Sequence, residues 1–190
     1  MQTIHKQILF GSTLSTVTLL ICFFILRDTR QTALQKELHS RIGYKFNFRD
    51  HVQLIHGDRS LLDRPYKILI YTDDRGCTSC NLKLREWSDM YETLFNRIVP
   101  GKLSVVILFD GREAEDMLAL VRNAHWEMPV LWDRDGEINS RRPFPKQVGM
   151  RCMLLDEEDR VLLVGNPFYS SSVSDLYLQT LVHSRYDETF

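Results

Sequence analysis

The stretch that decides the fold covers residues 67–87 and reads KILIYTDDRGCTSCNLKLREW. Its first part, 67–72, is apolar and rich in β-branched and aromatic residues, which predicts a short buried strand. Cys77 and Cys80 follow this strand, three residues apart. A helical pattern covers residues 79–98, with apolar residues at steps of three and four. The sequence therefore predicts a pair of cysteines between a buried strand and an amphipathic helix.

This placement favours thiol chemistry. A thiol at a helix N-terminus faces unpaired backbone N–H groups and the positive end of the helix dipole, and both favour the nucleophilic thiolate. A spacing of three residues brings the second sulfur over the first within one turn, so Cys77 can attack a disulfide and Cys80 can resolve the mixed disulfide. Gly76 permits a sharp turn, and backbone N–H groups near Thr78 and Ser79 can stabilise the thiolate.

The rest of the chain predicts an α/β architecture. Strands are expected at 103–109, 128–132, 150–155 and 161–164, and helices at 113–125 and from Ser172 onward, with a polar, proline-containing loop at 134–147.

Three stretches resemble the thioredoxin superfamily. They are residues 67–87, the strand SVVILF at 104–109, and CMLLDEEDRVLLVGNP at 152–167, which is similar to the family's β-hairpin. The resemblance implies a three-layer fold, a central mixed sheet flanked by helices, and a membrane-tethered thiol–disulfide oxidoreductase with Cys77 as nucleophile and Cys80 as resolving thiol. It also implies protein thiol or disulfide substrates, a protein electron donor or acceptor, and no organic cofactor.

Several positions differ from familiar thioredoxins. Gly76 stands where the family has Trp, and Thr78-Ser79 where it has Gly-Pro. The family's buried acid corresponds to Tyr71, and its cis-proline aligns with Met150. Asp73 is a candidate substitute for that acid and a candidate for tuning the thiol pKa, although a solvated turn is the simpler explanation.

Two alternatives remain open for the cysteines. Cys152 is either a third redox thiol or metal ligand, or a small buried apolar residue. The Cys77–Cys80 pair is either a redox dithiol or a structural disulfide or metal clip in a non-catalytic binding module of a cell-envelope complex. No His in the chain completes a recognisable metal-ligand motif, so no metal site is expected.

Residues 8–26 form a run of 19 uncharged, mostly apolar residues, long enough for a membrane-spanning helix. A cleaved signal peptide is the alternative, although no small-residue cleavage motif follows the run. The expected organisation is a cytoplasmic N-terminus at 1–7, an inner-membrane anchor at 8–26, a stalk at 27–45 and a thioredoxin-like domain at 46–190 facing the periplasm. The bias of positive charge does not itself favour this orientation.

The composition fits one globular domain. The 190 residues include 24 Lys and Arg, 25 Asp and Glu, and four Cys, for a formal net charge of −1. This balance gives no reason to expect nucleic-acid binding, and four cysteines are too few for a disulfide-stapled scaffold.

Overall fold

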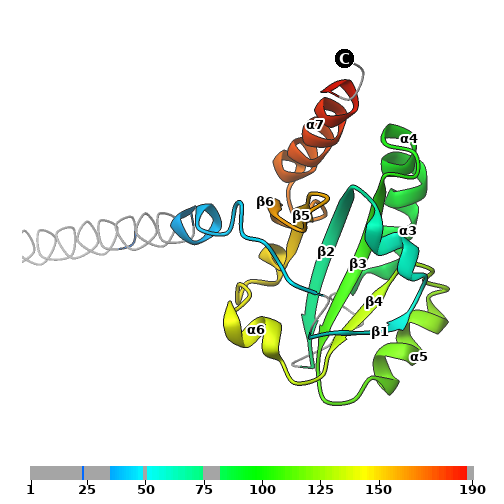
Figure 1. Ribbon diagram of the computed structural model, residues 1–190. Coiled ribbons are helices and arrows are strands. Elements are labelled where there is room, and N and C mark those ends of the chain that lie inside the picture. The colour runs from blue at the N-terminus through cyan, green and yellow to red at the C-terminus, as the bar shows by residue number, and fades with distance from the viewer. Residues whose placement is uncertain (1–22, 24–34, 49–50, 75–81, 188–190) are drawn as a thin grey trace, which may run out of the picture. The chain divides into compact units, whose positions relative to one another are not determined.

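The computed structural model describes residue 23 and residues 35–48, 51–74 and 82–187 (Figure 1). The chain divides into two compact units, Met1–Arg41 and Ile42–Phe190. In the first unit, residues 35–39 are helical and Arg41 forms an ion pair with Glu37 at 3.2 Å. Within the described residues, no helix combines the length and apolar character needed to cross a membrane. Apart from Phe23, the expected anchor at 8–26 lies outside them.

The second unit contains a six-stranded mixed sheet in the order β1-β4-β3-β2-β5-β6. The strands are β1 (Gln53–His56), β2 (Tyr66–Asp73), β3 (Leu103–Asp110), β4 (Val130–Asp133), β5 (Cys152–Leu155) and β6 (Val161–Val164). The pairs β2–β3 and β3–β4 are parallel, and the β1–β4, β2–β5 and β5–β6 pairs are antiparallel. Central β2 and β3 are buried on both faces, which explains their nearly continuous apolar sequences.

Helical segments connect these strands. They are η1 (Arg59–Asp63), α3 (Leu84–Met90), the π-helical η2 (Tyr91–Phe95), α4 (Asn96–Ile98), α5 (Glu115–Asn123), α6 (Glu137–Arg141), η3 (Val148–Met150) and α7 (Ser171–Asp187). Segments α3, η2 and α4 follow one another directly, so the helical pattern predicted up to Ile98 is confirmed over residues 84–98.

The α3, α5 and α7 helices contribute to one core with one face of the sheet. Their buried residues Trp87, Met117 and Tyr177 belong to the same apolar cluster as Ile68 and Ile107. The ring of Phe168 packs edge-on against Trp87, with the centroids 4.7 Å apart. Buried apolar area of this kind is the main stabilising contribution to the fold.

The other face carries a thinner cover. Leu69 and Leu108 belong to a second cluster that includes Phe46 from the segment 42–48, Ile138 from α6, and Phe144. The rings of Phe46 and Phe144 stack with centroids 5.6 Å apart. Segment 42–48 is fixed to the β5–β6 hairpin by hydrogen bonds that include Phe46 N–H to the Asp159 carbonyl at 3.0 Å.

Three elements differ from the sequence prediction. β1 was not expected, because QLIH is too short and weakly patterned to indicate a strand; Gly57 follows it with φ +84°, where a Cβ would approach the Met128 backbone to 2.8 Å. α6 lies inside the expected loop 134–147. α7 begins one residue earlier than expected, and the Oγ of Ser170 accepts a hydrogen bond from Val173 N–H.

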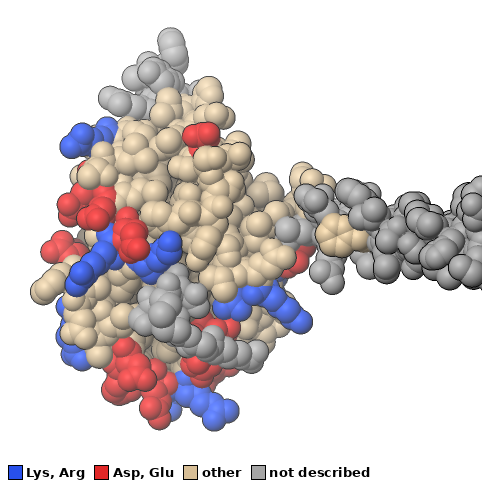
Figure 2. Space-filling model, turned by 180° about the vertical axis from the view of Figure 1, so that it is seen from behind, with Lys and Arg blue, Asp and Glu red and all other residues tan. Residues whose placement is uncertain are grey.

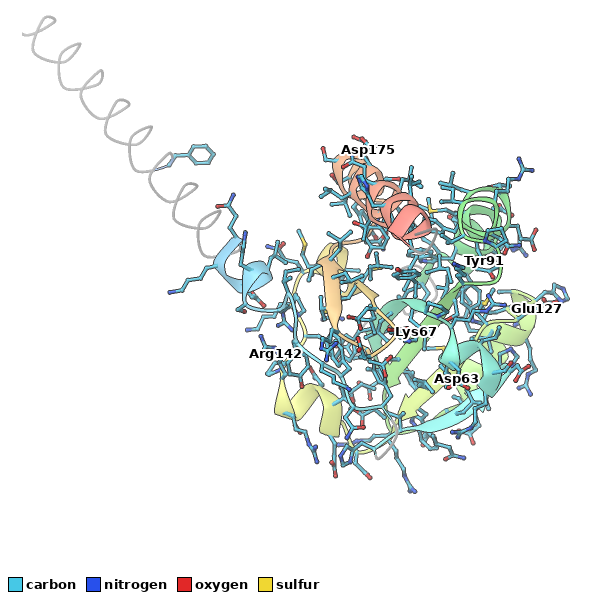
Figure 3. All side chains as sticks on the ribbon, turned by 45° about the horizontal axis from the view of Figure 1, so that its top comes forward. Asp63, Lys67, Tyr91, Glu127, Arg142 and Asp175 are labelled. Carbon is cyan, nitrogen blue, oxygen red and sulfur yellow. The ribbon has the colours of Figure 1, made fainter. Side chains whose placement is uncertain are left out.

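Charged side chains of both signs are interspersed on the surface of the domain. Seen from behind, Lys and Arg alternate with Asp and Glu over the lower part, whereas the upper part is largely uncharged (Figure 2). Asp175 and Glu127 lie at the surface, whereas the side chain of Lys67 lies in the interior of the domain (Figure 3).

Candidate functional site

The predicted site lies where the parallel strands end. Asp73 of β2 pairs in register with Asp110 of β3, and Asp110 with Asp133 of β4, so three carboxylates form one row at the carboxyl edge of the sheet. The residues that follow β2 carry the proposed chemistry: Gly76, Cys77, Thr78, Ser79 and Cys80. These five residues lie outside the described part of the chain.

Arg151 joins the two segments that border this edge. Its guanidinium forms an ion pair with the Asp73 carboxylate at 3.3 Å and donates to the Pro145 carbonyl at 3.0 Å. It also lies 5.5 Å from the ring centroid of Tyr71. Asp73 is therefore part of a partly buried ion pair and does not lie in a fully solvated turn, whereas Asp74 beside it is exposed.

Tyr71 occupies the position of the thioredoxin family's buried acid. Its hydroxyl donates to Asp110 Oδ2 at 2.7 Å, and its ring stacks on Phe144 with centroids 3.9 Å apart. Burial, followed by the hydrogen bond to Asp110, raises the pKa of Tyr71 well above its ordinary value. Tyr71 is thus a neutral donor at physiological pH and is not equivalent to an ionisable carboxyl group.

Met150 lies at the position of the family's cis-proline. It ends η3, and no peptide bond among the described residues is cis. The loop is held by backbone hydrogen bonds, including Asn166 N–H to the Gly149 carbonyl at 2.7 Å and Tyr71 N–H to the Arg151 carbonyl at 2.8 Å. The segment before β5 is therefore fixed against β2 without a proline.

Cys152 is fully enclosed by the core on the α7 side. Its Sγ lies 3.6 Å from the hydroxyl of Tyr177, which donates to the Gly165 carbonyl at 2.9 Å. Burial raises the pKa of the Cys152 thiol to about 12, so the thiol stays protonated at physiological pH. Of the two alternatives for Cys152, the structure favours the small buried apolar residue, because the nucleophilic form of cysteine is the thiolate.

We expect Cys152 to resist iodoacetamide in the folded protein and to react once the chain is unfolded in urea. The reason is its burial together with its raised pKa. Mass spectrometry of the peptide that contains Cys152 measures this labelling separately from the other three cysteines. Rapid labelling of Cys152 under native conditions would show that the strand opens or that the thiol is ionised.

A small pocket borders the site. Its lining residues are Ile70, Tyr71, Leu82, Val148, Arg151, Cys152 and Asn166. Leu82 comes two residues after Cys80 in the sequence, so this pocket is linked to the cysteine segment by a short length of chain. The exposed side chains of Val148 and Tyr169 lie beside it, and a Cβ built on Gly149 would be 3.5 Å from the Tyr169 ring.

The predicted helix is interrupted at Lys83. A helix was expected from Ser79; residues 79–81 lie outside the described part of the chain, and Leu82 is helical. Lys83 then adopts a left-handed conformation with φ 47° and ψ 47°, and α3 begins at Leu84. The Lys83 ammonium lies 5.5 Å from the ring centroid of Tyr169. This cation and this exposed aromatic ring therefore form the border of the site on the α3 side.

Asp133 is the buried member of the carboxylate row. It accepts hydrogen bonds from the backbone N–H groups of Glu137 at 2.9 Å and Ile138 at 2.8 Å, so it fixes the start of α6. Burial raises the pKa of Asp133, and the hydrogen bonds from Ile138 and Glu137 oppose this increase.

This shift predicts a pH dependence of stability. Because the folded-state pKa is raised, the contribution of Asp133 is fully present below its ordinary pKa and is lost as the pH rises through the folded-state value. We expect the stability of wild type relative to Asp133→Asn to fall as the pH rises above about 4, because the carboxyl group ionises and the amide does not. Urea unfolding of both chains at several pH values measures this; a constant difference would contradict the shift.

No metal site is formed by the described residues, since none of their His, Cys, Asp and Glu side chains form a group of three or more that could hold an ion. The three aspartates form a row at the strand ends and bind backbone, hydroxyl, amide and guanidinium donors instead.

Comparison with solved structures identifies the fold. A candidate thiol:disulfide interchange protein DsbE from Chlorobium tepidum is 17% identical and matches with a TM-score of 0.54 over 74% of this chain and 97% of its own. A domain of a candidate thiol-disulfide isomerase from Cytophaga hutchinsonii gives a TM-score of 0.52 at 16% identity, covering 78% of this chain and 97% of that one. PrxQ from Xylella fastidiosa gives 0.52 at 12% identity, covering 73% and 96%.

The second unit therefore has a thioredoxin-like α/β fold, with a mixed sheet flanked by helices. No family model matches the chain, and no curated protein matches it in sequence. At these identities the likeness establishes the fold alone.

Sequence reasoning missed several residues of this edge: Arg151, Asp110, Asp133 and Asn139. A signal for two of them was present, because each parallel strand ends in Asp, in YTD at 71–73, LFD at 108–110 and LWD at 131–133. Carboxyl ends of parallel strands meet at one edge of a sheet, so this repetition could have located the carboxylate row. Arg151 and Asn139 had no such signal, because they lie in connecting segments.

Proposed function

We propose that this chain is a thiol–disulfide oxidoreductase in which Cys77 is the nucleophile and Cys80 the resolving thiol. The observation that carries the proposal is that a Cys-Thr-Ser-Cys sequence directly follows the central strand of a thioredoxin-like sheet. Thiol–disulfide exchange is also the chemistry in the descriptions of the similar proteins from Chlorobium tepidum and Cytophaga hutchinsonii.

The proposed reaction balances without a cofactor. The Cys77 thiolate attacks one sulfur of a protein disulfide, forms a mixed disulfide and releases the other substrate sulfur as a thiolate. The Cys80 thiolate then attacks the Cys77 sulfur and releases the second substrate thiolate. The substrate gains two electrons, the chain ends with a Cys77–Cys80 disulfide, and a dithiol protein partner restores the reduced form. The reverse sequence oxidises a substrate dithiol.

Arg151 is the described cation best placed to support a thiolate at this edge. A nearby guanidinium lowers the pKa of a thiol by favouring its charged form, and the ion pair with Asp73 fixes the guanidinium and partly offsets its charge. Tyr71 is already committed to donating to Asp110. In this proposal Asp73 is therefore a better candidate than Tyr71 to exchange a proton with the resolving thiol.

We further propose that residues 8–26 anchor the chain in the inner membrane and that the domain faces the periplasm. The support is the 19-residue uncharged run and the chemistry, because protein disulfides persist in oxidising compartments. Its substrates there would be periplasmic protein thiols or disulfides.

A direct test is the reduction of insulin by the full-length chain, with dithiothreitol as the electron donor. We expect Cys77→Ser to lower the catalysed rate by about three orders of magnitude or more, to the uncatalysed background, because the nucleophile is lost. Cys152→Ala is the matched control and should retain activity, because Cys152 is a buried, protonated thiol. Equal activity of wild type and Cys77→Ser would exclude the proposal.

A second candidate function is a binding module in which the same cysteines form a structural disulfide or a metal clip. The observation that favours it is Met150, which replaces the cis-proline that helps the thioredoxin family hold a substrate strand. Such a module would contain a Cys77–Cys80 bond that resists reduction, whereas a catalytic pair would exchange readily.

A further inference from the structure

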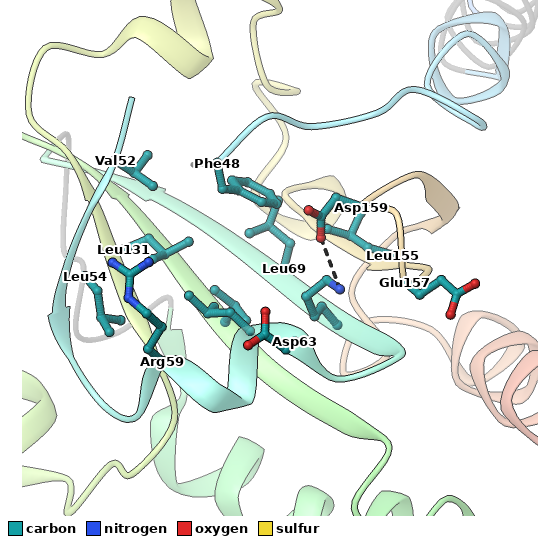
Figure 4. Close-up of a pocket in the computed structure, with 13 residues that line it drawn as sticks. Phe48, Val52, Leu54, Arg59, Asp63, Leu69, Leu131, Leu155, Glu157 and Asp159 are labelled. Carbon is teal, nitrogen blue, oxygen red and sulfur yellow. Dashed lines mark ion pairs between the residues drawn. The ribbon is translucent and has the colours of Figure 1, made fainter. Parts of the chain in front are cut away.

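The sheet face opposite α3, α5 and α7 contains a pocket of about 450 Å³, within the range typical of small-molecule sites (Figure 4). Its floor consists of one apolar residue from each of four strands: Leu69 of β2, Val106 of β3, Leu131 of β4 and Leu155 of β5. Its walls include Phe48, Leu54 and Leu62. This pocket shares no lining residue with the small pocket beside the predicted active site.

A buried ammonium group lies in this pocket. The side chain of Lys67 is only 4% exposed, and its Nζ forms an ion pair with Asp159 Oδ1 at 3.1 Å and donates to the Arg64 carbonyl at 3.1 Å. An ammonium has three donors, and two of them have partners among the described residues. One N–H of Lys67 therefore remains to bind an acceptor in a cavity whose lining combines apolar and charged side chains.

The charges around the pocket disfavour a ligand with a net charge. Arg59 and Lys67 are cationic, whereas Asp63, Glu157 and Asp159 are anionic, and residues of both signs border the same space (Figure 4). An anionic ligand near Lys67 would approach the Asp159 carboxylate, and a cationic ligand would approach the ammonium itself. A neutral oxygen acceptor avoids both repulsions and still accepts the free hydrogen bond.

We propose that this pocket binds a neutral, mostly apolar small molecule that carries a carbonyl-type oxygen, with the oxygen accepting from Lys67 and the apolar body on the Leu69–Leu131 floor. This inference is independent of the proposed thiol chemistry, because the lining of this pocket includes no cysteine and shares no residue with the pocket beside the predicted active site.

Benzophenone is a suitable probe, since it is neutral, has one carbonyl oxygen and crosslinks to nearby C–H bonds on irradiation. Diphenylmethane has a similar shape without the oxygen, and 4-benzoylbenzoate adds a negative charge. The full-length chain is irradiated over a range of benzophenone concentrations, with the other two compounds as competitors. Peptide mass spectrometry then gives the crosslinked residues and the benzophenone concentration at half-maximal yield. The detergent concentration is the same for wild type and for every variant.

We expect saturable crosslinking on the peptides that contain Phe48, Leu54 or Leu62. Benzophenone should reach half-maximal yield at a lower concentration than either analogue needs to halve that yield. Lys67→Met should weaken benzophenone binding about tenfold, which corresponds to about 1.4 kcal/mol, while diphenylmethane competes as before. Lys146→Met, at an exposed lysine away from the pocket, should change nothing. Leu62→Trp should reduce the binding of all three compounds by filling the cavity, and circular dichroism checks that both pocket variants fold.

Two results would overturn the proposal. One is the absence of saturable crosslinking on the pocket peptides in wild type. The other is competition by diphenylmethane or 4-benzoylbenzoate that halves the yield at or below the concentration at which benzophenone itself reaches half-maximal yield. That result would mean that the Lys67 donor does not select a neutral acceptor.

Discussion

In a Cys80→Ser variant, proteins linked by disulfide to Cys77 should accumulate, whereas wild type should show almost none. The nucleophile remains, but the thiol that releases it is missing, so each attack stops at the mixed disulfide. The adducts are detected as bands of higher mass on non-reducing gels that disappear with dithiothreitol. Mass spectrometry of the bands then identifies the substrates.

The matched control is the double variant Cys77→Ser, Cys80→Ser, in which the bands should be lost. Because Cys152 remains in both variants, adducts that survive in the double variant would show that Cys152 or Cys22 forms them. A Cys80→Ser variant without adducts, under both oxidising and reducing growth, would contradict the assignment and favour the binding module.

Replacing Trp87 by Ala should destabilise the domain by about 3–5 kcal/mol, the usual range for a large buried aromatic residue. Trp87 is 1% exposed and packs edge-on against Phe168, so its removal leaves a cavity between α3 and the segment before α7. The expected signal is a large decrease in the urea concentration at the midpoint of unfolding, as measured by far-UV circular dichroism.

Glu86→Ala is the matched control for this substitution. Glu86 is the preceding residue of α3 and is exposed, so a change within about 0.5 kcal/mol is expected. A Trp87→Ala effect as small as that of Glu86→Ala would mean that α3 does not pack on the sheet as described.

The central elements of the fold could be predicted because their sequence pattern follows directly from burial. β2 and β3 are apolar on both faces and stand out as continuous runs, and Trp87 and Phe95 repeat at helical spacing toward one core. The exposed α7 residues Leu176 and Val182 show where this reasoning fails, because a helical apolar pattern alone would place both on the buried face with Tyr177 and Leu181. An apolar side chain does not show by itself whether a neighbour covers it.

The candidate site was only partly predictable from the sequence. The position of Cys77 and Cys80 after β2 follows from local sequence, as does their expected chemistry. The ion pair between Arg151 and Asp73 joins residues 78 positions apart in the sequence and depends on the antiparallel pairing of β5 with β2. The pocket under Lys67 could not be predicted for the same reason, since its floor comes from four strands that only the sheet order brings together.

The central claim is that Cys77 and Cys80 form a dithiol that cycles between reduced and oxidised states. Its most direct test is a redox titration of the full-length chain in glutathione and dithiothreitol buffers, with alkylation and mass spectrometry of the peptide that contains both cysteines. We expect a two-electron transition at a potential between about −120 and −270 mV, the range of catalytic pairs. A pair that stays oxidised below about −300 mV, or that forms no disulfide at any potential, would contradict the account.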